Sequence, residues 1–154
     1  MKFATIFRSL AAEKVRYCVL GRTAAVYYGL QVVTMDIDII LSSDRANTMR
    51  FFKALRRMGA TFQLPSTMEM ELFESQKVSR FMIGDLVLDV LKWQEGFSTA
   101  SWTRVRKARY LGTTVRIADL HDLIQTKSQT PRRKDKADVR ALQKILINQK
   151  ETRK

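Results

Sequence analysis

The chain has 154 residues, and its 28 Lys and Arg against 15 Asp and Glu give a formal net charge of +13 at pH 7. Hydrophobic residues make up 45%, with only two prolines and six glycines, which excludes a disordered or low-complexity chain. This length is typical of one domain with one buried core, so we expect a single domain over residues 1–154. The positive charge favours polyanionic partners such as nucleic acid or nucleotide phosphates, although a basic surface that only aids solubility is the alternative.

The sequence carries no signal for a membrane or for export. No apolar run approaches the roughly 20 residues that a membrane-spanning helix needs, and Arg8 interrupts the apolar N-terminal stretch. We therefore expect a cytoplasmic protein with no membrane partner. With only Cys18 and His121 as soft ligands, an internal disulfide is excluded and a zinc site is disfavoured. Any metal ion would be held by carboxylates.

The spacing of apolar residues predicts an alternation of helices and strands. Apolar residues three or four apart predict helices, and strict alternation with polar residues predicts strands. The resulting order predicts an α+β or α/β protein whose sheet packs against helices, with a core over about 15–117 and C-terminal helices over about 119–148. In chain order we expect a helix over 3–14, a strand over 15–20, a helix over 23–28, a strand over 34–41, a helix from Ser43 or Asp44 to Met58, strands over 68–73, 78–83, 86–91, 105–110 and 113–117, and helices over 119–130 and 135–148.

Three kinds of local pattern add detail to these elements. In the helix that precedes Gly59, apolar residues recur at every third position, and these are expected to face the core. Compact turns at 84–85 and 111–112 predict two hairpins. Asp119 followed by Asp122 gives a capping-box pattern for the next helix. The apolar positions of the helix before Gly59 are Met49, Phe52, Leu55 and Met58.

The triplet Asp36-Ile37-Asp38 is the strongest chemical signal in the chain. On an extended strand, residues two apart lie about 7 Å from each other and point to the same face. Their carboxylates could therefore hold one divalent ion or a close pair of ions. Without a cation, the two carboxylates would repel and raise each other's pKa. The alternative is an exposed acidic strand face, or a turn role for Asp36.

Gly21 ends the apolar strand before this triplet and precedes a predicted helix. A strand that turns into a helix presents backbone N–H groups and the helix N-terminus to a phosphate chain. The predicted helix and return would bring this turn and the acidic strand face to face. A glycine that only makes a turn is the alternative.

The stretch YCVLGRTAAVYYGLQVVTMDIDIIL, residues 17–41, resembles the signature of the polymerase-beta-type nucleotidyltransferase superfamily. That signature is glycine followed by glycine or serine, a helix, and Asp-x-Asp on the next strand. The resemblance implies a nucleotidyltransferase fold with a mixed sheet flanked by helices, and a third carboxylate on a later strand. Asp89 is the matching candidate, and Asp85, in the predicted turn at 84–85, is its rival.

The run ADLHDLIQTKSQTPRRKDKADVRAL, residues 118–142, is similar to the ending of AbiEii-like toxin nucleotidyltransferases and their relatives. In those proteins a helical Leu-Ile-x-x-Lys precedes a basic Lys-Asp-x-x-Asp segment. This likeness implies a toxin with an antitoxin partner and an RNA acceptor such as tRNA. The residues that fall on the pattern are Lys127, Arg133, Lys134, Asp135 and Asp138.

Together the two resemblances imply transfer of a nucleotide from a nucleoside triphosphate (NTP) to a hydroxyl, with Mg²⁺ or Mn²⁺ as cofactor. They imply three groups of site residues. Without the resemblance, the basic cluster at 132–134 is more typical of a solvated helix start. The implied catalytic and metal-binding residues are Asp36, Asp38 and Asp89, the nucleotide-binding residues are Gly21, Arg22 and Lys127, and the nucleic-acid-binding residues are Arg132, Arg133 and Lys134.

Two positions depart from the superfamily pattern. Arg22 stands where glycine or serine is usual, and Val32 stands where relatives often carry a basic residue. The Arg22 side chain could bind phosphate as a cation or obstruct the path of the triphosphate. A catalytically degenerate module that binds nucleic acid is therefore the second hypothesis. Among the aromatic residues, Trp93 is the better candidate for stacking on a base, because Tyr27 and Tyr28 fit a packing role on a short helix.

Overall fold

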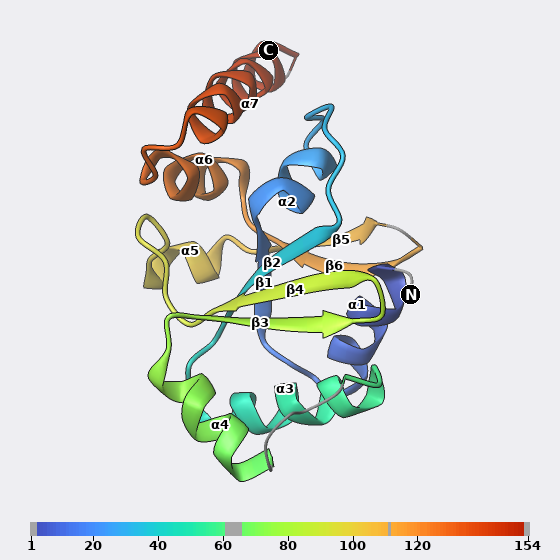
Figure 1. Ribbon diagram of the computed structural model, residues 1–154. Coiled ribbons are helices and arrows are strands. Elements are labelled where there is room, and N and C mark those ends of the chain that lie inside the picture. Colours follow the sequence, from blue (N-terminus) through green and yellow to red (C-terminus); the bar gives the residue numbers. More distant parts are fainter. Residues whose placement is uncertain (1–2, 61–65, 111, 153–154) are drawn as a thin grey trace.

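Within the described residues 3–60, 66–110 and 112–152, the computed structural model forms a single six-stranded sheet of order β3-β4-β2-β1-β6-β5 (Figure 1). The central pairs β2–β4 and β1–β6 are parallel, whereas β1–β2 and the two outer hairpins are antiparallel. The sheet is therefore mixed, and β3 and β5 are its edges. The strands are β1 (Tyr17–Leu20), β2 (Asp36–Leu41), β3 (Val78–Ile83), β4 (Leu86–Leu91), β5 (Arg106–Tyr110) and β6 (Thr113–Ile117).

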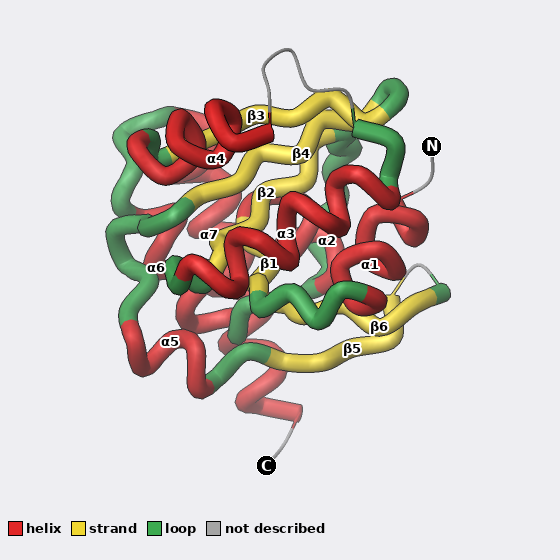
Figure 2. Tube along the Cα trace, turned by 90° about the horizontal axis from the view of Figure 1, so that it is seen from below, coloured by secondary structure: helices red, strands yellow, loops and turns green. Residues whose placement is uncertain are grey.

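Helices cover the sheet in two groups. Figure 2 shows α1, α3 and α4 in front of the sheet, with α6 and α7 behind it. On the α3 side, four phenylalanine rings from α3, α4 and β3 pack together with centroids 5.4–6.2 Å apart. This apolar cluster covers one face of the sheet. The helices are α1 (Phe3–Ala12), α2 (Gly21–Tyr27), α3 (Arg45–Arg57), α4 (Ser66–Ser75), α5 (Thr99–Thr103), α6 (Leu120–Ser128) and α7 (Arg133–Thr152).

From α1 to β2 the chain follows the sequence prediction closely. β1 begins two residues after the predicted start and α2 begins at Gly21, before the predicted residue 23. β2 begins at Asp36, two residues after the predicted start, and the Thr34 hydroxyl accepts from the Asp36 N–H at 3.2 Å. Tyr28 packs as expected, since its buried hydroxyl donates to the Ala118 carbonyl at 2.6 Å.

Helix α3 has the predicted position but a different buried face. Its N-cap is Asp44, whose side chain accepts from the Asn47 N–H at 2.8 Å. Met49, predicted to face the core, is 56% exposed, so that prediction is wrong. Phe51 lies in the core instead, beside Phe52. The every-third-residue pattern drifts around a helix of 3.6 residues per turn, which carries its first member onto the solvent side.

The strand predicted over 68–73 is wrong, because these residues belong to α4. The letters Met-Glu-Met-Glu alternate as a half-buried strand would. In the helix, however, only Phe73 of this segment is buried, and Met68 and Leu72 are about half exposed. Helix α5, for which no element was predicted, begins at a capping box formed by Ser98 and Ser101.

The C-terminal helices are present, with one correction. Asp119 caps α6 by accepting from the His121 N–H at 3.1 Å. Asp122 does not close a capping box, because its buried carboxylate accepts from Ser101 and, at 2.9 and 2.7 Å, from Arg104. Part of the predicted turn at 111–112 lies outside the described residues. Among the described residues, no helix is long and apolar enough to cross a membrane.

Candidate active site

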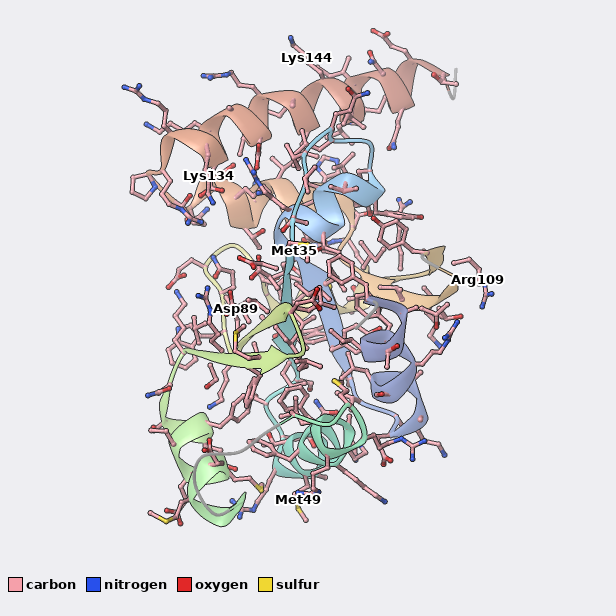
Figure 3. All side chains as sticks on the ribbon, turned by 45° about the vertical axis from the view of Figure 1, so that its right-hand side comes forward. Met35, Met49, Asp89, Arg109, Lys134 and Lys144 are labelled. Carbon is pink, nitrogen blue, oxygen red and sulfur yellow. The ribbon has the colours of Figure 1, made fainter. Side chains whose placement is uncertain are left out.

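A cleft of about 580 Å³ lies between the open face of the sheet and the C-terminal helices. Carboxylates line its strand side, and basic side chains together with Asp135 line its helix side. Figure 3 shows Asp89 on β4 and Lys134 near the start of α7 on facing sides of this region. The charged side chains that line the cleft are Arg22, Asp36, Asp38, Asp89, Lys127, Arg132, Lys134 and Asp135.

The sheet register brings the predicted acidic residues together. β2 and β4 are parallel neighbours, and Asp38 is directly paired with Asp89. Asp36 lies two residues before Asp38 on the same strand face, beside the cleft. Asp85, the rival third carboxylate, lies in the turn between β3 and β4 and is not among the residues that line the cleft. The geometry therefore favours Asp89 over Asp85.

Gly21 has two structural reasons to be glycine. Its φ of 64° lies in the left-handed region that side chains other than glycine rarely adopt. A Cβ built on Gly21 would also overlap with Oδ2 of Asp38. The turn after β1 therefore packs directly against the Asp38 carboxylate. Thr23, in the next turn, donates to the Asp36 carbonyl at 3.0 Å and ties α2 to β2.

Burial and nearby carboxylates together shift the pKa of Asp38. Burial, followed by the nearby carboxylates of Asp89 and Asp36, raises the pKa of Asp38 from 3.8 to about 6, and Lys127 and Arg132 only partly oppose that rise. Asp38 makes no ion pair with another described residue. Negative charge on the strand side of the cleft is therefore incompletely balanced.

Asp89 has a cationic partner that the sequence prediction did not identify. Arg80 on β3 donates from Nε to Oδ1 at 2.8 Å and from Nη2 to Oδ2 at 3.0 Å. The two residues face each other across the antiparallel β3–β4 pair. The two-residue turn at 84–85 places residue 80 opposite residue 89, so counting back from that turn could have identified the pair.

The helix side of the cleft carries a buried cluster of paired charges. Lys127 on α6 is 7% exposed, and its Nζ lies 3.1 Å from Asp138 Oδ2 and 3.6 Å from Asp135 Oδ1. Burial alone would raise the pKa of Asp135, but the Thr130 hydroxyl, Lys127 and Arg132 together hold that pKa below its ordinary value. The Lys-Asp-x-x-Asp spacing thus turns both carboxylates of α7 toward Lys127.

Arg22 joins this cluster from α2. Its Nε donates to Asp138 Oδ2 at 3.2 Å, so the side chain contacts α7 while it lines the cleft. The ion pair gives Arg22 a structural role besides the two that the sequence suggests. Among the basic residues at 132–134, Arg132 pairs with Asp135 at 2.8 Å, Lys134 lines the cleft, and Arg133 is exposed outside it.

Trp93, the predicted stacking residue, does not line the cleft. It is 51% exposed and borders a separate hollow of about 460 Å³, together with Phe73 and Lys92. Lys92 lies 3.8 Å above the Phe73 ring centroid, and burial lowers its pKa to about 8. A role for Trp93 at the acidic cleft therefore has no structural support.

Comparison with known proteins identifies the fold. No family model and no curated protein matches the chain. The solution structure of the antibiotic-resistance factor ANT(2'')-Ia has a TM-score of 0.59 at 13% identity, covering 97% of this chain and 88% of that one. The chain has the nucleotidyltransferase fold. A candidate nucleotidyltransferase from Thermotoga maritima, TM1012, agrees, with a TM-score of 0.57 at 18% identity over 93% of this chain and 89% of that one. The predicted α+β nucleotidyltransferase fold is confirmed.

The acidic residues fit a divalent cation in kind, but they do not form a closed site as they stand. Carboxylate oxygens are the ligands that Mg²⁺ prefers, and Asp36, Asp38 and Asp89 lie together on the strand side of the cleft. Across the described residues, however, no three His, Cys, Asp or Glu side chains are arranged to hold one metal ion. Both oxygens of Asp89 accept from Arg80 instead.

Proposed function

We propose that the protein is a metal-dependent nucleotidyltransferase that transfers a nucleotide from an NTP to a hydroxyl acceptor. The observation that carries the proposal is the direct pairing of Asp38 with Asp89, beside Asp36, on the strand side of a cleft with cations opposite. An unbalanced group of carboxylates in a cleft is typical of a functional site, because its repulsion has no benefit for folding.

In the proposed reaction the acceptor hydroxyl oxygen attacks the α-phosphorus, and the bond from that phosphorus to the pyrophosphate oxygen breaks. The hydroxyl proton passes to a carboxylate of the acidic group, and pyrophosphate leaves. Asp36 and Asp38, with Asp89, would hold Mg²⁺ or Mn²⁺, which would neutralise phosphate charge and favour ionisation of the hydroxyl. Backbone at Gly21 and the side chains of Arg22 and Lys127 would accommodate the triphosphate.

The acceptor that best fits the charge of the chain is RNA, with tRNA as the first choice. A net charge of +13 attracts polyanions, and Lys134 and Arg132 line the cleft while Arg133 is exposed beside it. The AbiEii-like ending supports a toxin role with an antitoxin partner and action in the cytoplasm. These assignments rest on the sequence likeness and on charge.

A second candidate function is a module of the same fold that binds nucleic acid without catalysis. Two observations favour it: Arg22 replaces the usual small residue, and Arg80 holds the carboxylate of Asp89. Such a module would keep its basic surface but would have no need of the acidic group.

The deciding experiment incubates the protein with each labelled NTP, Mg²⁺ or Mn²⁺, and total RNA. We expect label transfer from the wild type and none from Asp36→Ala/Asp38→Ala. The matched control is Glu71→Ala, an exposed acidic position on α4, which should transfer label normally. Absence of any metal-dependent NTP binding would overturn the enzyme proposal. Equal RNA binding by the wild type and the double variant, with no label moved, would support the binding module.

A further inference from the structure

We propose that Arg80 is a gate on the third carboxylate. In this inference, which rests on the proposed function, Arg80 occupies Asp89 while the cleft lacks a divalent cation, and it moves to the phosphate chain once a cation binds Asp89. Arg80 would then make the binding of metal depend on the binding of nucleotide.

The geometry of the pair gives the first argument. The guanidinium donates to both Asp89 oxygens, at 2.8 and 3.0 Å, in the bidentate arrangement that is among the strongest side-chain pairings. Each oxygen keeps a second lone pair, but a divalent ion bound there would lie within a few ångströms of the guanidinium charge. Mutual repulsion between these cations disfavours the simultaneous presence of both.

The position of Arg80 gives the second argument. It lies on β3, an edge strand, and its side chain is 63% exposed, whereas that of Asp89 is 12% exposed. The β3–β4 ladder is made by backbone groups, so the side chain can leave Asp89 without breaking the sheet. A second bidentate arginine–aspartate pair, Arg104 with Asp122, differs from Arg80 with Asp89 in two ways. Asp122 also accepts a hydrogen bond from the Ser101 hydroxyl, and it does not line the cleft.

The charges around Arg80 give the third argument. Besides Asp89, the carboxylates of Asp36 and Asp38 act electrostatically on the guanidinium. A cation bound to these acidic residues would remove the attraction that holds Arg80 in place. The released side chain would remain beside the cleft, on the strand next to β4, where a triphosphate offers it new acceptor oxygens.

The consequence is a measurable coupling between two ligands. Nucleotide should increase the affinity for the cation, and by thermodynamic reciprocity the cation should increase the affinity for nucleotide by the same factor. Removal of Arg80 should strengthen binding of the cation alone, because the competing charge is gone, and should weaken the coupling.

The test measures Mn²⁺ binding by electron paramagnetic resonance, with and without a non-hydrolysable NTP analogue. We expect Arg80→Gln to bind Mn²⁺ alone about tenfold more tightly than the wild type, with the analogue raising the Mn²⁺ affinity by a smaller factor than in the wild type, since allosteric couplings commonly span about 5- to 150-fold. Arg80→Lys, which keeps the charge but not the bidentate fork, should fall between the two. It also provides the comparison if Arg80→Gln folds poorly by circular dichroism.

Arg109→Gln is the matched control. Arg109 lies on β5, the opposite edge strand, far from Asp89 (Figure 3), so the variant changes the net charge equally without touching the acidic group. Its Mn²⁺ affinity should stay within about twofold of the wild type, because an exposed charge at that range is largely screened.

Asp38→Asn separates failure of this inference from failure of the proposed function. Mn²⁺ binding that Asp38→Asn leaves unchanged would overturn the metal site itself. Binding that Asp38→Asn abolishes, but that folded Arg80→Gln and Arg80→Lys leave at the wild-type level or weaken, would overturn only the gate.

Discussion

Two groups of carboxylates lie on opposite sides of the same cleft, and they differ in how their charge is balanced. On the helix side, Asp135 and Asp138 are 5% and 6% exposed in their side chains, and both lie against the buried Lys127. On the strand side, Asp38 and Asp89 face each other in register, and burial and its acidic neighbours raise the pKa of Asp38 to about 6. The helix-side carboxylates have a cation of the protein, Lys127, beside them. On the strand side, Asp38 has no such partner among the described residues.

The difference separates structural charge from functional charge. A buried carboxylate with a cation beside it joins separate elements, as Asp138 joins α7 to α6 and α2. A carboxylate held near others of the same charge opposes folding, so it is better explained by a ligand that supplies the missing cation. Variants on each side of the cleft should therefore have opposite effects on stability.

The largest effect is expected at Lys127. Lys127→Met leaves two buried carboxylates without their central cation and should lower the free energy of unfolding by about 3–5 kcal/mol. Urea denaturation measures the change. Lys134→Met, an exposed lysine of the same region, should stay within about 0.5 kcal/mol of the wild type. If Lys127→Met lowers the free energy of unfolding by less than about 1 kcal/mol, the helix-side cluster does not stabilise the packing of α7.

Asp38→Asn should act in the opposite direction. Because the folded pKa, about 6, exceeds the ordinary 3.8, the folded state keeps a proton that the unfolded state has lost, and wild-type stability falls as pH rises from about 4 to about 6. Asn does not titrate. Above pH 6 the variant should be more stable by about 1–2 kcal/mol, after allowance for water in the cleft.

The measurement for Asp38→Asn is urea denaturation at pH 4.5 and 7.5 with a chelator present. The gain should be much smaller at pH 4.5, where less of the wild-type carboxylate is ionised. An equal difference at both pH values would mean that the effect does not come from the ionisation of Asp38.

Mg²⁺ should neutralise the unpaired negative charge of the strand-side carboxylates and so stabilise the folded protein. A ligand at ten times its dissociation constant stabilises the folded state by about 1.4 kcal/mol. We expect Mg²⁺ to raise the thermal unfolding midpoint of the wild type and a chelator to reverse the rise. A similar increase in Asp38→Asn would place the binding of Mg²⁺ elsewhere on the protein.

The smallest effect is expected at Arg22. Its ion pair with Asp138 is partly exposed, and Asp138 keeps Lys127 as a partner. Arg22→Ala should therefore destabilise the protein by about 1 kcal/mol in urea denaturation. A stabilised variant would instead indicate that the Arg22 side chain is strained in the cleft.

The sequence predicts the acidic strand well and its surroundings less well. Alternation around Ile37 places Asp36 and Asp38 on one face, because strand periodicity is a local property. The choice of Asp89 over Asp85 needed the parallel register of β2 and β4, which no local pattern encodes. The pairing of Arg80 with Asp89 could have been predicted, since the predicted turn at 84–85 determines which residues of β3 and β4 lie opposite each other.

The wrong predictions came from local sequence patterns that tertiary contacts override. Alternating Met and Glu over 68–71 is compatible with a strand. The segment is instead a helix, from which Phe73 packs against the phenylalanines of α3. Asp122 fits a capping box by spacing, yet its carboxylate binds Arg104, eighteen residues earlier in the chain. The buried cluster around Lys127 likewise unites three helices, so no single segment indicates which of its charges are paired.

Gly21 has no side chain, yet its replacement should reduce activity as replacement of the neighbouring Asp38 does. Any Cβ there would displace Oδ2 of Asp38 while also imposing an unfavourable backbone angle. A saturating mutational scan read out by activity should therefore group Gly21 with the aspartates. The same scan read out by protein abundance should separate Gly21 from Asp38, because strain at Gly21 weakens the fold whereas Asp38→Asn strengthens it.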